Sequence, residues 1–259
     1  GYPWKCFQIR RNERALFMSA EAKVAVVVGV GPGLGGSVAV KFAKEGYAVA
    51  LMSRKEESCK STADRIKELG GKSLYVHIDV CDEKKVKAAF DEVRKTLGNP
   101  GVLVYNAGNA AMGKILELDL EKFKKTWEVG CYGALLCARQ ALPAMVEAKT
   151  GTILITSATA AFRAGAGWAP FCVSKFGLRA LSQSITKEFA PKGVHVCHIR
   201  IDCVMDTPMT RASYAKGWPT EKLGNCDQIA ETYYAMHMQP KFGWTNEIDI
   251  RPMGESWTC

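Results

Sequence analysis

Short apolar runs alternate with longer amphipathic stretches along most of this chain of 259 residues. Seven runs have the character of strands: 24–29, 48–52, 74–79, 102–105, 152–156, 194–200 and 247–250. Helical patterns lie between them, near 34–45, 56–69, 83–97, 119–148 and 171–190. Strands that are apolar on both faces and separated by helices indicate a parallel sheet covered on both sides. The sequence therefore predicts an α/β, Rossmann-type doubly wound sheet of about seven strands, with its ligand beyond the carboxyl ends of the strands.

The order of these elements indicates one large domain over residues 22–259, preceded by a basic arm at 1–21. A chain of this length can bury a sizeable single core. The segment 205–245 breaks the alternation and predicts a lid on the substrate side of the domain. Its apolar side chains favour a substrate pocket or, equally, a hydrophobic contact surface. They are Met205, Met209, Tyr214, Trp218 and Tyr233.

The formal net charge of +9 is unevenly placed, because residues 1–17 carry four basic side chains against one acidic one. Such an arm suits an anionic partner, a membrane surface or nucleic acid, or else is a solvated tail. Since no basic and aromatic interleaving recurs elsewhere, we expect no nucleic-acid partner. The longest apolar runs, such as 24–30, are far short of a membrane span, so we expect no transmembrane segment.

The ten cysteines form no C-x-x-C pair, and the four histidines make no metal-ligand spacing with them. They indicate core thiols of a reducing compartment and no metal site. Met18 resembles a natural start directly before the first strand. The Arg-rich residues ahead of it indicate either a processed organelle-targeting segment or a translated remnant. We expect the mitochondrial matrix in preference to the cytoplasm.

A glycine cluster joins the first strand to the first helix. It runs Gly29-Val-Gly31-Pro-Gly33-Leu34-Gly35. Glycines at such a junction allow a tight turn, the close approach of a pyrophosphate and the packing of helix on strand. The phosphates then meet the free N–H groups and the positive end of the helix dipole. The cluster predicts a dinucleotide site.

The second strand ends in Ser53-Arg54-Lys55. A protein that binds NAD usually has an acidic residue here, which holds the ribose 2′-hydroxyl. A guanidinium and an ammonium instead suit a 2′-phosphate, and Arg54 can also lie on the adenine face. The alternative is ordinary solvated charge at the start of a helix. We predict NADP(H) as the cofactor, with NAD(H) less favoured.

Pieces that follow the later strands complete a pattern that resembles the short-chain dehydrogenase/reductase family over residues 22–252. These pieces are Asp79-Val80, Asn106-Ala107-Gly108, Ser157 and the helix that carries Lys175. The resemblance implies that the glycine loop and residues 106–108 hold the dinucleotide, and that Asp79 contacts the adenine. It also implies that Lys175 binds the nicotinamide ribose and that Ser157 holds the substrate oxygen.

The chain departs from this family at the residue that transfers the proton. The tyrosine that the family has four residues before the lysine is Phe171 here, so Phe-x-x-x-Lys stands for Tyr-x-x-x-Lys and indicates a divergent branch. A phenyl ring carries no proton, so any residual reduction would have to use Ser157, Thr159 or a water. By periodicity alone Lys175 lies on a polar stripe and would be solvated. The resemblance instead makes it a ribose ligand.

Three further features differ from the family pattern. The asparagine of the fourth helix falls on Gly130, and the Pro-Gly pair after the sixth strand is Asp202-Cys203. The spacing from Ser157 to residue 171 is one longer than is common. Val204 and Thr207 still suit the nicotinamide side of the site.

Two functions from different classes are consistent with these observations. One is an oxidoreductase that acts on a carbonyl or an alcohol with an altered proton relay, and its positioning of the cofactor would survive the loss of the acid. The other is a catalytically silent subunit that keeps the cofactor pocket within a larger assembly. The retained Ser157 and Lys175 favour the first. The basic arm and the lost catalytic groups favour the second.

The helices near 119–148 and 171–190 are those that the resembled family commonly uses to pair subunits. We expect them to be covered by a second copy or by another protein, through small or apolar outward residues. Those residues are Ala138, Ala141, Leu142, Leu178 and Leu181. The alternative is that the helices bury these residues against the sheet.

Overall fold

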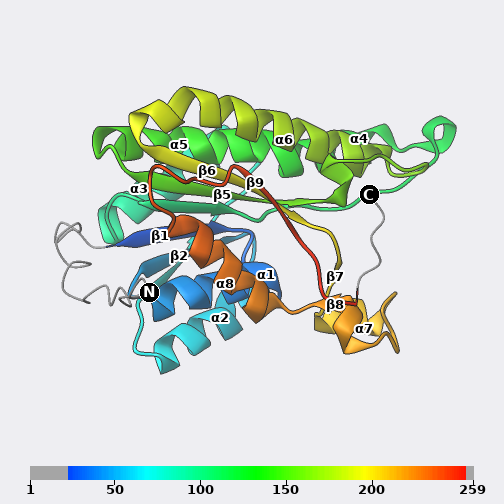
Figure 1. Cartoon of the computed structure of the whole chain (residues 1–259), viewed down its shortest axis with the longest axis horizontal. Coiled ribbons are helices and arrows are strands. Elements are labelled where there is room, and N and C mark those ends of the chain that lie inside the picture. The colour runs from blue at the N-terminus through cyan, green and yellow to red at the C-terminus, as the bar shows by residue number, and fades with distance from the viewer. Residues whose placement is uncertain (1–22, 255–259) are drawn as a thin grey trace, which may run out of the picture.

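The computed structural model describes residues 23–254, so the predicted basic arm at 1–21 lies outside the described residues (Figure 1). Seven parallel strands form the main sheet in the order β3-β2-β1-β4-β5-β6-β9. Their bounds are β1 Val24–Val28, β2 Ala48–Ser53, β3 Ser73–His77, β4 Val102–Tyr105, β5 Gly151–Ala158, β6 Val194–Ile201 and β9 Glu247–Ile250. The predicted doubly wound sheet is confirmed.

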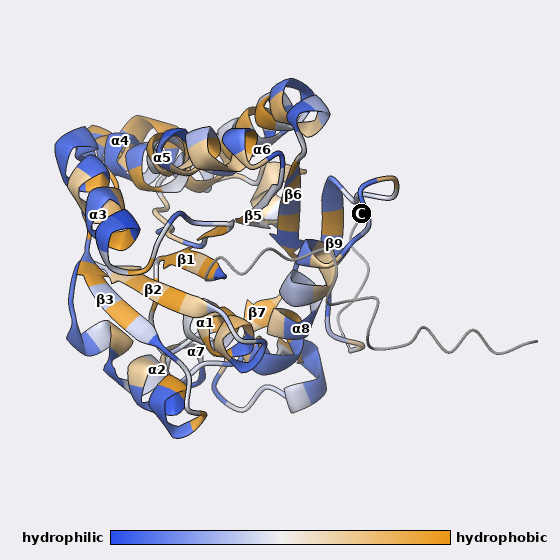
Figure 2. Ribbon diagram, turned by 90° about the vertical axis from the view of Figure 1, so that its left-hand side faces the viewer, coloured by the Kyte–Doolittle hydropathy of each residue, from blue (hydrophilic) through white to orange (hydrophobic). Residues whose placement is uncertain are grey.

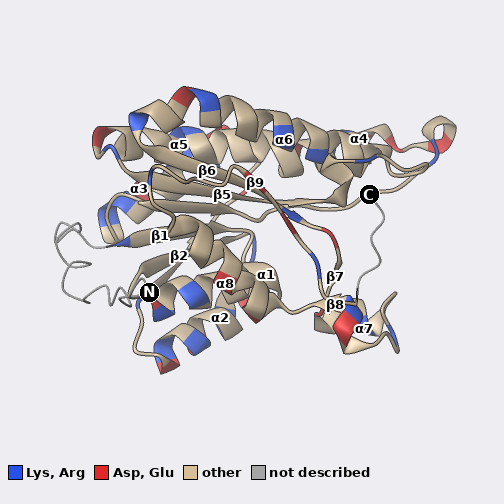
Figure 3. Cartoon of the chain, viewed as in Figure 1, with Lys and Arg blue, Asp and Glu red and all other residues tan. Residues whose placement is uncertain are grey.

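Helices cover both faces of this sheet. One layer contains α3 (Glu83–Thr96), α4 (Leu120–Trp127), α5 (Gly133–Glu147) and α6 (Ala169–Phe189), and the other contains α1 (Leu34–Lys44), α2 (Glu57–Glu68) and α8 (Cys226–His237) (Figure 1). Alternate residues of each central strand enter one core or the other, so β1 is buried along its whole length. Figure 2 shows the apolar strands β1 and β2 between the two helical layers. Figure 3 shows the charged residues mainly on the helices rather than on the strands.

The chain reverses its winding direction between β1 and β4. β1 pairs with β2 on one side and with β4 on the other. The carboxyl ends of β1 and β4 therefore lie side by side, and Asn106 N donates to Val28 O at 2.8 Å. This is the place where open α/β sheets bind their ligands.

The predicted helix over 119–148 is three pieces rather than one. A π-helical turn, η2 (Glu128–Tyr132), separates α4 from α5. The buried hydroxyl of Tyr105 donates to Val129 O inside this turn, and a side chain that bonds a helical carbonyl is a usual cause of such a break. Gly133 allows this approach, because a Cβ at this position would lie 2.5 Å from the Tyr105 hydroxyl.

The small and apolar residues predicted to face outward on these helices face inward, which corrects that expectation. Ala138, Ala141, Leu142 and Leu178 are buried, and Leu181 is partly buried against the same core. The sheet needs an apolar cover on this face, and these residues provide it. The exposed apolar side chains on the two helices are others, namely Leu120, Trp127, Val173 and Phe176.

One helical stretch in the described part of the chain, Leu120–Glu147, is long and apolar enough to cross a membrane by length and composition alone. Over half of its most apolar window, 56%, is buried inside the protein. Packing against the sheet accounts for that apolarity, so the stretch is weak support for a membrane span.

The predicted lid over 205–245 is not one unit. Residues 226–237 form α8, which packs on α1 as part of the core. Tyr233 is therefore not a pocket residue: it is fully buried, and its hydroxyl lies 2.8 Å from Thr156 Oγ1. The rest of the segment forms the short strands β7 (Val204–Met205) and β8 (Leu223–Gly224) and the helix α7 (Pro208–Ala212), at the carboxyl edge of the sheet.

An ion-pair network fastens α6 to the edge strand β9. Arg179 donates to both oxygens of Glu247 at 2.8–3.1 Å, and Arg200 donates to the same carboxylate at 3.1 Å. The hydrogen bond from Arg179 is the main cause that lowers the pKa of Glu247 to about 2. Arg179 thus ties α6, the helix that carries Lys175, to the edge of the sheet.

Candidate functional site

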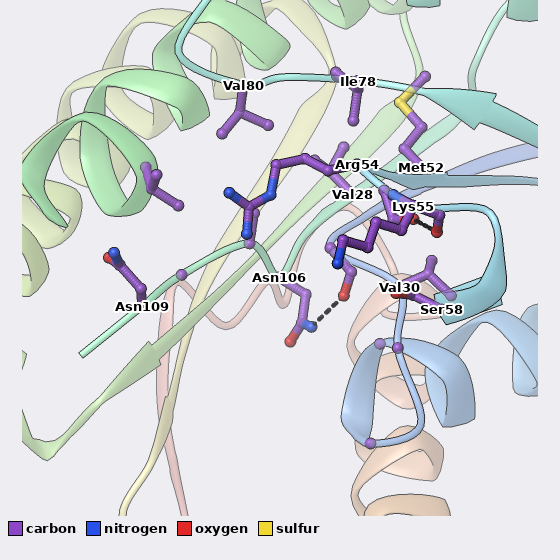
Figure 4. Close-up of a pocket in the computed structure, with 18 of the residues that line it drawn as sticks. Val28, Val30, Met52, Arg54, Lys55, Ser58, Ile78, Val80, Asn106 and Asn109 are labelled. Carbon is purple, nitrogen blue, oxygen red and sulfur yellow. Dashed lines mark hydrogen bonds between the residues drawn. The ribbon is translucent and has the colours of Figure 1, made fainter. Parts of the chain in front are cut away.

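A cavity of about 510 Å³ opens at the carboxyl ends of β1, β2 and β4 (Figure 4). Its lining includes thirteen of the residues predicted to bind the cofactor: Gly29, Gly31, Gly33, Leu34, Gly35, Ser53, Arg54, Lys55, Asp79, Val80, Asn106, Ala107 and Gly108. The structure therefore brings the glycine turn and the ends of three further strands together in one place. Of the other predicted cofactor residues, Lys175, Val204 and Thr207 do not line this cavity. Thr207 Cγ2 would lie 3.2 Å from a Cβ atom added to Gly33, so Thr207 is next to the glycine turn.

Sequence reasoning missed several lining residues. They are Val28, Val30, Met52, Ser58, Ile78, Asn109, Lys125 and Val129, whereas Met209, an apolar side chain of the predicted lid, does line the cavity. Most of them adjoin a predicted residue in the chain, so a wider margin around each motif would have found them. Lys125 and Val129 come from α4 and η2, and no motif in the sequence links these residues to the glycine turn.

The glycine turn is shaped by two close approaches of backbone to backbone. Gly29 has φ of +90°, and a Cβ there would lie 2.6 Å from Ala107 N. A Cβ on Gly35 would collide with Gly29 O. Gly31, in contrast, has nothing within 4 Å of its Cβ position and borders open space. Gly29 and Gly35 are thus needed for the fold, while Gly31 keeps room for a ligand.

We expect Gly29→Ala to lower the free energy of unfolding by about 2–4 kcal/mol, because an alanine is strained at this φ and its methyl would push apart the ends of β1 and β4. Urea denaturation of the full chain measures this loss. Gly31→Ala is the matched control and should stay within about 1 kcal/mol of the parent, since its methyl meets no atom. Equal stability of the two variants would contradict this account of the turn.

The start of α1 presents free backbone donors to the cavity. Its N-cap residue, Gly33, makes no side-chain cap, and the first turn contains no acidic residue. The N–H groups at this end lack partners within the helix and favour an anion. Asn106 holds the facing wall in place, because its Nδ2 donates to Gly29 O at 2.9 Å. The Asp79 carboxylate accepts from Cys81 N at 3.1 Å, which shapes the turn after β3.

Two cations border the same cavity. Ser53 ties the turn after β2, since its Oγ donates to Lys55 O at 2.5 Å. Arg54 and Lys55 are exposed, extend toward the pocket in Figure 4, and form no salt bridge with any described residue. Unpaired cations opposite an uncapped helix start fit a ligand with several phosphates. The residues present therefore fit a dinucleotide that carries an additional phosphate.

A second group of predicted residues lies behind Gly108. Lys175 is 6% exposed, and its Nζ lies 3.6 Å from the place of a Cβ on Gly108. Nζ donates to Thr156 O at 3.2 Å and lies 5.7 Å from the centroid of the Phe171 ring. Burial lowers the pKa of Lys175 to about 8. Ser157 follows Thr156 on β5, is buried, and its Oγ has no hydrogen-bond partner among the described residues.

Two of the positions that differ from the family pattern are occupied by contacts near this group. A Cβ on Gly130 would collide with Ser174 Oγ, so the serine hydroxyl takes up the space at the base of that side chain. Asp202 accepts a hydrogen bond from Thr159 Oγ1 and pairs with Arg251 Nε at 2.6 Å. Asp202, which stands where the family has its Pro-Gly pair, is thus held in an ion pair with Arg251.

The family model described as short chain dehydrogenase matches residues 23–217. The chain belongs to this family. An uncharacterized oxidoreductase of Staphylococcus aureus strain USA300 is 30% identical to it over 233 residues, which cover 89% of this chain and 97% of that protein.

Solved structures of other proteins are also similar to this chain. An alcohol dehydrogenase of the archaeon Thermococcus sibiricus, complexed with 5-hydroxy-NADP, is 27% identical with a TM-score of 0.82, covering 92% of this chain and 100% of that one. A metagenomic short-chain oxidoreductase in complex with NADP is 25% identical with a TM-score of 0.78, covering 90% and 98%.

Proposed function

We propose that this short-chain dehydrogenase binds NADP(H) and transfers a hydride between it and a carbonyl or alcohol substrate, with a proton relay that lacks the family's phenol. The observation that carries the proposal is the cavity at β1 and β4, where Arg54 and Lys55 stand beside the glycine turn without a carboxylate partner among residues 23–254. The NADP complexes of two similar solved structures support this choice of cofactor. The alcohol dehydrogenase among them supports the substrate class.

Each wall of the cavity has a part in holding the cofactor. The N–H groups at the start of α1 would bind the pyrophosphate, and Arg54 and Lys55 the 2′-phosphate. Asp79 would contact the adenine, and Lys175, beside Gly108, would hold the nicotinamide ribose. When bound, the cofactor supplies the hydride, and the protein supplies orientation, exclusion of water and a proton.

Phe171 is the proposed counterpart of the tyrosine that serves the family as acid and base. Its ring faces Lys175, as a phenol at the same place would, but it has no proton to transfer. The loss of a positioned general acid costs about 10²–10⁴ in rate. Turnover should therefore be slow, while cofactor binding should be intact.

A silent subunit of a larger assembly, mitochondrial if the matrix expectation holds, is the second candidate. Phe171 favours it, as does Gly130, whose side-chain space Ser174 already occupies. Both changes remove groups of the proton relay while the cofactor cavity stays complete. The two candidate functions predict the same cofactor binding but different turnover.

One experiment separates them. The full chain is titrated with NADPH by calorimetry and then assayed for NADPH oxidation with a panel of aldehydes, prochiral ketones and vicinal diketones. The proposal predicts binding together with slow, substrate-dependent oxidation. Binding without oxidation above the substrate-free rate across the panel would favour the silent subunit. Absence of binding would exclude both.

A further inference from the structure

Lys175 is a buried cation without a carboxylate partner among residues 23–254. It is 6% exposed, and its one hydrogen bond in that range is to the neutral carbonyl of Thr156. Desolvation disfavours a charged amine, and here no opposite charge offsets it. The ammonium therefore gives up its proton more readily than an exposed lysine does, and burial lowers its pKa to about 8.

The ammonium lies directly behind the wall of the cofactor cavity. Nζ lies 3.6 Å from the Cβ position of Gly108, which lines the cofactor cavity. It is held by the carbonyl of Thr156, the residue before Ser157 on β5. Ser157 and Lys175 thus lie next to each other behind Gly108, and a substrate that reaches them from the cavity would pass this glycine. The apolar ring of Phe171 is a further neighbour, with its centroid 5.7 Å from Nζ.

The other candidate proton sources are less suited to the task. Ser157 can hold the substrate oxygen, but serine hydroxyls are not among the usual general acids. The hydroxyl hydrogen of Thr159 is donated to Asp202. Asp202 in turn forms an ion pair with Arg251, so its charge is balanced by that guanidinium.

Few titratable groups face Lys175, and none of them changes charge in the pH range where it ionises. Cys131, from η2, is a neighbour whose pKa burial raises. His198, from β6, is fully buried, and desolvation lowers its pKa to about 4. Arg179, one turn along α6, is paired with Glu247. Between pH 6 and pH 9, roughly, Lys175 is therefore the group of this cluster that changes charge.

We propose that Lys175 is itself the proton donor for carbonyl reduction in this chain, an inference that rests on the proposed function. As the hydride from NADPH reaches the carbonyl carbon, an Nζ–H bond of Lys175 breaks and the O–H bond of the product alcohol forms, directly or through one water. The neutral amine then takes a proton back from solvent. Lys175 thus performs the proton transfer that the phenol performs elsewhere in the family.

The pH profile of reduction is the first test. Because the ammonium is the active form, kcat with NADPH and the best ketone of the panel should be level below pH 8 and fall about tenfold per unit above it. A profile that is flat up to pH 10 would overturn the inference.

Lys175→Arg separates proton transfer from cofactor holding. The guanidinium keeps the charge but releases no proton at any working pH. We expect kcat to fall about 100-fold or more, with the KM for NADPH and its calorimetric affinity within about threefold of the parent. Lys60→Arg, on the exposed face of α2, is the matched control. Unchanged kcat, or a loss confined to NADPH affinity, would contradict a proton-donor role. In Phe171→Tyr/Lys175→Arg the new phenol should recover part of kcat.

A third measurement does not depend on turnover. The side-chain amines of the isotopically labelled full chain are titrated by NMR, and Lys175 is assigned by its loss in Lys175→Arg. Its pKa should lie near 8, apart from the exposed lysines, and its resonance should shift when NADPH binds. A pKa above 10 would overturn the inference even in an active enzyme. No turnover with NADPH bound would instead remove the proposed function, and the inference with it.

Discussion

Phe171→Tyr is expected to reduce ketones about 10- to 100-fold faster than the parent chain. Lys175 Nζ lies 5.7 Å from the centre of the present Phe171 ring, so the new hydroxyl would stand beside the ammonium. The positive charge there favours the phenolate and lowers the pKa of the phenol. A positioned general acid contributes about 10²–10⁴ in rate, and the gain should lie at the low end because Gly130 supplies no anchoring amide. NADPH oxidation with the same panel of ketones and aldehydes measures it.

Phe176→Tyr is the matched control for this variant. Phe176 lies on the same helix and is 41% exposed, so a hydroxyl there points away from Lys175 and should leave the rate unchanged. Gly130→Asn added to Phe171→Tyr should help only when Ser174→Ala makes room, since the serine hydroxyl fills the Cβ position. If Phe171→Tyr is no faster than the parent on any substrate, the pocket is not a reductase site that lacks only its acid.

Arg54→Ala is expected to weaken NADPH binding by about 10- to 100-fold and to leave NADH binding nearly unchanged. Arg54 borders the cavity without a carboxylate partner among the described residues, so its guanidinium is available to a phosphate. A hydrogen bond to a charged group contributes about 1.5–3 kcal/mol, which corresponds to that range of affinity. Calorimetric titration of the variant with each cofactor measures the two effects separately.

Lys60→Ala controls for the loss of a positive charge near the site. Lys60 is exposed on α2 and does not line the cavity, so its removal should change the affinity for NADPH by less than about twofold. An equal loss in both variants would mean that general electrostatic attraction holds the cofactor. An equal loss of NADPH and NADH binding in Arg54→Ala would mean that Arg54 does not contact the 2′-phosphate.

Much of the fold could be predicted because local signals and the tertiary structure agree. Strands buried on both faces are uniformly apolar, and β1 and β4 show this pattern along their length. The glycine turn was found for the same reason, since Gly29 and Gly35 stand where a Cβ would meet backbone. NADP(H) was predicted from Arg54 and Lys55, and two similar solved structures contain an NADP form.

The errors arose where a contact distant in sequence decides the outcome. The π-turn at 128–132 depends on the hydroxyl of Tyr105, a strand residue far away in the chain. The apolar residues of α5 were expected to face outward, but helical periodicity cannot say which side of a helix the sheet takes. Tyr233 was placed in a lid because its segment is rich in aromatic and turn residues, whereas α8 closes the core over α1.

The measurement that tests the central claim most directly is a paired calorimetric titration of the unmodified full chain with NADPH and with NADH. Arg54 and Lys55, which have no carboxylate partner among the described residues, stand beside the uncapped start of α1 and predict that NADPH binds at least about tenfold more tightly than NADH. Raising the salt concentration should narrow this difference, because the extra contact is between opposite charges. Equal affinities, tighter binding of NADH, or no binding of either cofactor would contradict the assignment of this cavity to NADP(H).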